Sequence, residues 1–168
     1  YGAGAAVEAV SETSSIPVVY ASVYNDIRRL RKNNVAGCSY RVSMSSFLRY
    51  LRKARDVHSI GVLYSPFEID SRSQLEALRV LGKDLGMQVV PLAARNAREK
   101  ETQLKLKEFD ALFVTGSALA NHEIELIHRI CMKRKIPVLS LFEGTEEYAF
   151  LTIAPDVEII GKETARIV

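Results

Sequence analysis

Residues that can bind a small molecule are concentrated in three loops, each of which follows a run of apolar residues that predicts a buried strand. The loops cover residues 64–71, 115–120 and 142–145. Their hydroxyls and carboxylates can bind charged groups, and their aromatic rings can stack on an apolar side chain. This set of groups predicts a site for an amino-acid-like ligand. The candidates are Tyr64, Ser65, Phe67, Glu68, Asp70, Ser71, Thr115, Ser117, Phe142 and Glu143.

The positions of these loops depend on the elements around them. If the strands are parallel, their C-terminal ends lie at one edge of the sheet, and the three loops share that rim. The first loop leads into a helix, whose opening N–H groups at residues 71–73 could bind a carboxylate. In the alternative interpretation, Asp70 and Ser71 only cap this helix, where Ser71 and Gln74 have capping-box spacing.

Apolar runs and helical patterns alternate along the chain. Continuous apolar runs, rather than alternating ones, are typical of parallel strands that are covered by helices on both faces. The pattern therefore predicts an α/β fold with a doubly wound, mostly parallel sheet. Strands are expected at residues 16–21, 59–64, 87–92, 111–115, 136–141 and 150–153. Helices are expected at residues 46–55, from Asp70 to a stop at Gly86, at 97–107, at 121–133, and after a cap at Asp156.

Signatures of catalysis are weak. Ser117 lies in TGSALA, which lacks the G-x-S-x-G pattern of a nucleophile elbow. The histidines His58, His122 and His128 form no H-E-x-x-H motif. The opening YGAGAA lacks the third glycine of a dinucleotide-binding loop, and we interpret it as a strand-to-helix loop. We expect no catalytic residue, no metal and no cofactor, although an enzyme that uses Glu143 or Ser117 stays open as an alternative.

Composition limits the partners. The formal net charge of +3 is too small to indicate nucleic acid, and the basic clusters at residues 27–32 and 49–55 are expected to be solvated helix faces. No apolar run reaches the ~20 residues that a membrane helix needs. Cys38 and Cys131 form no metal motif, and their pairing cannot be deduced from spacing. Cys131, beside Ile127 and Ile130, is expected to be a core residue.

Turn-forming residues in KNNVAG, residues 32–37, indicate a linker. We expect a complete α/β lobe at residues 37–154, with the remnants of another lobe and its hinge crossings at residues 1–36 and 155–168. The chain begins with Tyr1 and is expected to start partway through a longer protein. The apolar faces of residues 1–30 and of the last helix should then bury against each other or against a second copy, as in a homodimer.

The order of the segments resembles the type I periplasmic-binding-protein-like substrate-binding proteins of ABC transporters, in the branch linked to aromatic amino-acid uptake. Family members read close to IPVVF-A, NVTG, VGVLYNPGE-NS, VDAIYVP-DN and IPVF, followed by a late D-x-x-x-x-G-x-x-TA. The matching pieces here are IPVVYASVYND (16–26), NVAGCS (34–39), SIGVLYSPFEIDSRSQ (59–74), FDALFVTGSAL (109–119), KIPVLSL (135–141) and APDVEIIGKETARI (154–167).

The resemblance implies two Rossmann-like α/β lobes with the ligand in the cleft between them. Three loops of the complete lobe match the family's ligand loops, and two short segments match the other lobe. Phe67 replaces a common glycine. The ligand-binding residues that the resemblance implies are Ser65, Asp70, Ser71, Thr115, Ser117, Phe142 and Glu143 in the complete lobe, and Gly4, Ala5, Tyr24 and Asn25 in the other. Phe67 stays a ligand-binding candidate because of its ring.

The same resemblance implies a function without catalysis. The protein would bind a small amino-acid-like solute and close by hinge motion. Its partners would be that ligand and a membrane permease, and its location periplasmic or extracytoplasmic, with a lipid anchor left open. The alternative is a ligand-sensing input domain of a signalling protein with the same fold. Binding by this segment alone is expected to be weak or absent, because half of the cleft lies outside it.

Overall fold

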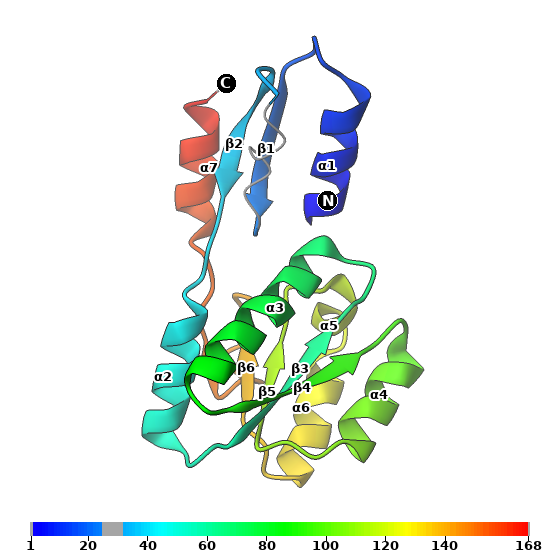
Figure 1. Cartoon of the computed structure of the whole chain (residues 1–168), viewed down its shortest axis with the longest axis vertical. Helices are drawn as coiled ribbons and strands as arrows, with labels where there is room; N and C mark the ends of the chain where they lie inside the picture. The colour runs from blue at the N-terminus through cyan, green and yellow to red at the C-terminus, as the bar shows by residue number, and fades with distance from the viewer. Residues whose placement is uncertain (1, 25–31, 168) are drawn as a thin grey trace. The chain divides into compact units, whose positions relative to one another are not determined.

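The computed structural model describes residues 2–24 and 32–167, which fall into two compact units (Figure 1). The first unit contains residues 1–41 and 155–168, and the second contains residues 42–154. In the first unit, β1 and β2 form a parallel pair that contacts α1 and α7. The bounds are α1 Gly2–Glu12, β1 Val18–Val23, β2 Val35–Ser39 and α7 Val157–Ala165.

The linker expected at residues 32–37 is wrong in its second half, because β2 begins at Val35. The turn is present at residues 33–34. Asn34 Nδ2 donates to the Ile16 carbonyl at 2.7 Å, which helps to set the register of β2 against β1. Gly37 lies opposite Tyr20, and a Cβ at this glycine would come within 2.2 Å of the Tyr20 carbonyl oxygen. Glycine is therefore required by close backbone approach within a strand.

The opening glycines are also helical. The loop expected at residues 2–6 is wrong, because α1 begins at Gly2 and buries Ala3 and Val10. Of the apolar side chains expected to be covered in this unit, Val19, Val157 and Ile159 are exposed. Burial of this surface against a second copy stays a prediction.

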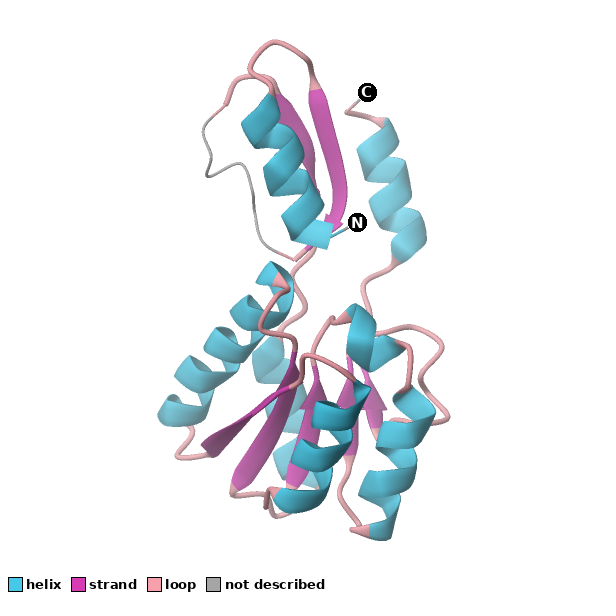
Figure 2. Cartoon of the chain, turned by 90° about the vertical axis from the view of Figure 1, so that its right-hand side faces the viewer, coloured by secondary structure: helices cyan, strands magenta, loops and turns pink. Residues whose placement is uncertain are grey.

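The second unit is a doubly wound, parallel α/β sheet, as expected, and its strand order is β4-β3-β5-β6-β7. Helices lie on both of its faces (Figure 2). After β3 the chain adds β4 on one side and then β5 on the other, so the order reverses between β3 and β5. The strands are β3 Ser59–Tyr64, β4 Gln88–Ala93, β5 Ala111–Val114, β6 Val138–Ser140 and β7 Leu151–Thr152. The helices are α2 Met44–Ala54, α3 Ile69–Asp84, α4 Ala97–Leu106, α5 Ala118–Asn121 and α6 Ile124–Lys133.

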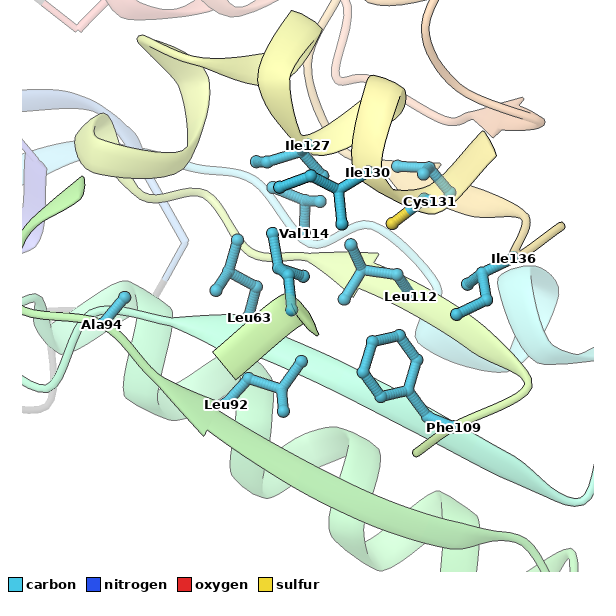
Figure 3. Packing of buried hydrophobic residues seen from close by; sticks show 12 residues of the cluster. Leu63, Leu92, Ala94, Phe109, Leu112, Val114, Ile127, Ile130, Cys131 and Ile136 are labelled. Atoms are coloured by element: carbon cyan, nitrogen blue, oxygen red, sulfur yellow. The ribbon is translucent and has the colours of Figure 1, made fainter. Parts of the chain in front are cut away.

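One face of this sheet packs against α4 and α6 through a cluster of buried apolar side chains (Figure 3). Ile127, Ile130 and Cys131 project from α6 toward Leu112 and Val114 of β5. The expectation that Cys131 is a core residue is confirmed, and burial raises the pKa of its thiol to about 12. Cys131 and Cys38 are both free thiols.

The observed helix ends agree only in part with those expected from the sequence. Gly86 has φ +64 after α3, and the Asp156 carboxylate accepts hydrogen bonds from the first turn of α7, both as expected. The capping box at Ser71 is wrong, because α3 begins at Ile69 and its N-cap is Glu68. Among the described residues, no helix combines the length and the apolar character needed to cross a membrane.

Candidate functional site

The three candidate loops lie side by side at one edge of the second unit's sheet. Leu63 pairs with Val114, and Val114 pairs with Ser140, so the C-terminal ends of β3, β5 and β6 are adjacent. The reversal of strand order falls between the first two of these strands. Ligands of doubly wound proteins bind outside the strand ends at such a switch point. The edge that the loops share, called the rim below, is therefore the candidate site.

Buried hydroxyls join the first two loops. The Ser65 N–H donates to Ser71 Oγ at 3.0 Å, and Ser71 Oγ lies 2.6 Å from Thr115 Oγ1. Thr115 Oγ1 donates to the Leu63 carbonyl at 2.8 Å, so it accepts its bond from Ser71. Both hydroxyl-bearing residues are fully buried. In this structure their hydroxyls fix the loops in place rather than face outward.

This arrangement gives a prediction for Thr115. Thr115→Val keeps the shape of the side chain but leaves Ser71 Oγ without its acceptor, and it should lower the free energy of unfolding by about 1–2 kcal/mol. The control is Thr102→Val on the exposed surface of α4, where the lost bond to the Arg98 carbonyl is solvated and a change within about 0.5 kcal/mol is expected. Urea denaturation measures both, and equal costs would contradict the buried chain of hydroxyls.

Two further links connect α3 with the loop after β5. Gln74 is fully buried, and its Oε1 accepts the Gly116 N–H at 2.7 Å. The Glu68 carboxylate accepts from Ser117 Oγ at 2.9 Å and from the Ala118 N–H at 3.2 Å. We call these contacts of Glu68 and Gln74 with residues 116–118 the α3–β5 brace. Sequence spacing indicates only a capping-box role for Gln74, because it does not show which loop a buried amide reaches.

Helix α3 begins earlier than expected, so its opening N–H groups, which are expected to bind a carboxylate, belong to different residues. The first intrahelical hydrogen bond runs from the Arg72 N–H to the Glu68 carbonyl. The opening amides of the helix are therefore at residues 69–71 rather than at 71–73. Asp70 lies in this first turn and is half-buried. The helix start still lies at the rim, two residues earlier than expected.

The third loop is compact. Thr145 Oγ1 donates to the Phe142 carbonyl at 2.6 Å and contacts Ser140 Oγ at 2.8 Å. Phe142 is half-buried and Glu143 is exposed. A hydroxyl at the base of the loop thus fixes its backbone, while the two predicted ligand residues remain accessible.

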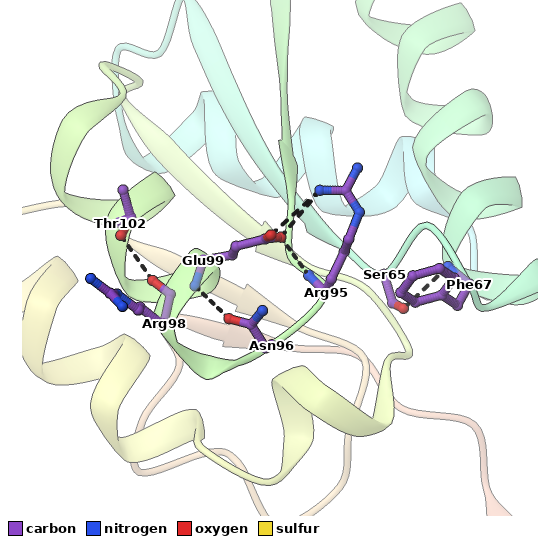
Figure 4. Close-up of polar contacts among 7 residues, drawn as sticks. All are labelled: Ser65, Phe67, Arg95, Asn96, Arg98, Glu99 and Thr102. Carbon is purple, nitrogen blue, oxygen red and sulfur yellow. Dashed lines mark hydrogen bonds and ion pairs between the residues drawn. The ribbon is translucent and has the colours of Figure 1, made fainter.

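A fourth loop, which sequence reasoning missed, follows β4 at the same edge. The Ala94 N–H donates to the Tyr64 carbonyl, which places this loop beside the one that contains Phe67. Arg95 pairs with Glu99, whose carboxylate also accepts the Arg95 N–H at 3.0 Å (Figure 4). Phe67 is 73% exposed. The available signal was topological, because every parallel strand ends at the same edge.

The remaining candidates lie outside this unit. Gly4 and Ala5 are exposed on α1, and the Tyr24 ring packs edge-to-face on Tyr40 at 5.9 Å. Asn25 and most of the basic cluster at residues 27–32 lie outside the described residues. Ligand contact by any candidate in either unit stays a prediction.

A cleft of about 480 Å³ lies away from the rim, between α2 and α3. Arg49, Arg52 and Lys53 line it, together with Leu81 and Leu85. All three cations are exposed, in agreement with the expected solvated helix face. The described residues hold no group of three or more His, Cys, Asp or Glu placed to bind a metal ion.

A doubly wound parallel lobe whose polar loops gather at the switch point defines a class of small-molecule-binding α/β lobes. Comparison of the sequence with known families identifies the protein family within this class. The chain belongs to the ABC transporter substrate binding protein family, whose model matches residues 1–168.

Known proteins are similar to this chain in sequence or in fold. A tyrosine-binding protein of Clostridioides difficile is 23% identical over 147 residues, 82% of this chain and 43% of that protein. A conserved domain protein of Vibrio cholerae has a TM-score of 0.88 at 22% identity, over 98% of this chain and 60% of that one. The ABC domain of a Streptococcus pneumonia protein in complex with L-Trp has a TM-score of 0.83 at 21% identity, over 99% and 62%. The chain thus spans about half the length of the curated relative and three fifths of the solved structures.

Proposed function

We propose that the protein is the solute-binding component of an ABC transporter and binds an amino-acid-like ligand without transforming it. The α3–β5 brace carries the proposal, because it holds polar loops rigidly at the point where α/β lobes bind ligands. Preorganised polar groups of this kind lower the cost of binding. The family to which the chain belongs, and the binding proteins among its relatives, support the same function.

An aromatic amino acid is the ligand class we favour. One relative is a tyrosine-binding protein, and one solved structure with the same fold is a complex with L-Trp. In this chain the exposed Phe67 ring lies on the first rim loop, where it can cover an aromatic ligand. The ligand would lie between this rim and a second lobe that closes over it by hinge motion. The closed form would be recognised by a permease outside the cytoplasm.

Calorimetric titration of the full-length protein against the aromatic amino acids tests the proposal. We expect L-tryptophan or L-tyrosine to release heat and to raise the unfolding temperature. Phe67→Ala should weaken binding by about tenfold, because it removes a ring contact. The matched control is Leu106→Ala, which removes an equally exposed apolar side chain at the far end of α4 and should leave affinity unchanged. If none of the aromatic amino acids binds, the proposed ligand class is contradicted.

A further inference from the structure

Glu68 is a rim carboxylate whose position is fixed by hydrogen bonds. Its Oε1 and Oε2 accept hydrogen bonds from different residues of the loop after β5, and its own backbone forms the N-cap of α3. Glu143, by contrast, is exposed on its loop. A carboxylate held at both oxygens presents its remaining lone pairs in a defined direction, which is what recognition of a small ligand requires.

The charge of this carboxylate is not balanced by a neighbouring cation. Among the described residues, no lysine, arginine or histidine forms an ion pair with Glu68, although ion pairs are present elsewhere on α3 and on α4. A carboxylate offers about four lone-pair sites, and Ser117 and Ala118 occupy one on each oxygen. Glu68 therefore keeps spare acceptor capacity while it is half-buried.

The same brace contains an unused donor. Gln74 Oε1 holds the Gly116 N–H, which fixes the orientation of the amide, and Nε2 is enclosed without a hydrogen-bond partner among the described residues. A buried donor of this kind needs an oxygen acceptor from outside the chain, such as a water molecule or a ligand. The α3–β5 brace thus has two groups with unused hydrogen-bonding capacity. These are the acceptor oxygens of Glu68 and the Nε2 donor of Gln74.

We propose that the Glu68 carboxylate is the anchor for the α-ammonium group of the ligand, so that the rim selects amino acids over the corresponding carboxylic acids. This inference rests on the proposed function and names the group that provides its specificity. An ammonium group supplies both the positive charge and the N–H donors that Glu68 lacks. Selection follows because an analogue without the amino group leaves this carboxylate desolvated and unpaired.

The test compares two ligands that differ in the amino group alone. L-tryptophan and indole-3-propionate are titrated into the full-length protein and into Glu68→Gln, which keeps the size of the side chain and one carbonyl oxygen for the brace. We expect the native protein to bind L-tryptophan more tightly than indole-3-propionate by about 10- to 100-fold, the effect of one charged hydrogen-bonded pair. In Glu68→Gln this ratio should fall close to one.

Glu76→Gln is the matched control, because it removes the same charge from the exposed face of α3, where Glu76 pairs with Arg79. Its affinity ratio should equal that of the native protein. The ratio is unaffected by a uniform loss of affinity, and equal native affinities for the two ligands would still refute the role of Glu68 should Glu68→Gln not fold. Equal native affinities for the two ligands, or an unchanged ratio in Glu68→Gln, would overturn the role of Glu68 and leave the proposed function standing. Absence of binding to all aromatic amino acids would instead overturn the proposed ligand class, and this inference with it.

Discussion

Replacing Glu123 by glutamine is expected to lower the free energy of unfolding by about 3 kcal/mol. The reason lies in its partner Lys100, whose side chain is fully buried. Lys100 Nζ contacts the Glu123 carboxylate and donates to the Leu119 carbonyl at 3.3 Å. Glutamine preserves the shape of residue 123 but leaves an ammonium group enclosed without a counter-charge.

The two partners of this pair are not equivalent. The Glu123 side chain is 28% exposed, so water can solvate it when the lysine is removed. Lys100→Met, which removes the buried charge and retains most of the volume, should therefore cost only about 1 kcal/mol. Adding Glu123→Gln to Lys100→Met should cost little more, because no buried charge then remains. The contribution of each partner depends on the order of removal, as expected for coupled residues.

Urea denaturation of the two single variants and the double variant measures this coupling. The exposed Lys105–Glu101 pair on the same helix is the matched control, and Glu101→Gln should change stability little. If the Glu123→Gln variant were as stable as the Lys100→Met variant, Lys100 could not be a buried charge that depends on Glu123. Because Lys100 also holds the Leu119 carbonyl in α5, Glu123→Gln should additionally speed hydrogen exchange at the rim loop after β5.

Local pattern predicted the central strands of the second unit because burial on both faces demands continuous apolar sequence. Strands β3 to β6 and the helices between them lie within a few residues of their expected positions. Strand β2 could not be predicted in this way. Its sequence VAGCS is short and contains Gly37, and it becomes a strand because it pairs with β1 and approaches Tyr20 closely. That contact depends on tertiary structure, which local sequence does not report.

The rim was predictable for a topological reason, whereas the direction of its side chains was not. Parallel strands end at one edge, and this places the loops that contain Ser65, Thr115 and Phe142 together. Because α3 begins two residues earlier than expected, Ser71 and Gln74 lie inside the helix rather than at its cap. Both side chains are fully buried and contact the loop after β5. Such a shift is within the usual uncertainty of a helix boundary and decides the role of every residue in the first turn.

Phe113→Ala should produce the largest loss of stability, about 4 kcal/mol. Phe113 is fully buried on β5, a central strand of the larger sheet. Its ring meets the Phe47 ring of α2 edge-to-face, at 5.4 Å between centroids and 87° between planes. Alanine would lose the transfer free energy of the ring and leave a cavity that neighbouring fully buried side chains cannot readily fill.

Phe150→Ala is the matched control, because it removes the same atoms from a ring that is 47% exposed. The Arg55 guanidinium lies 5.9 Å from the centre of this ring. Its expected cost is below about 1 kcal/mol. A double-mutant cycle of Phe113→Ala with Phe47→Ala should give a coupling of about 1 kcal/mol, because either truncation already removes the ring contact. Equal denaturation midpoints for Phe113→Ala and Phe150→Ala would contradict the packing of α2 on β5. Helix α2 is the first element of the second unit. Because Phe113→Ala weakens the packing of α2 on β5, it should also make residues 42–54 more susceptible to proteolysis.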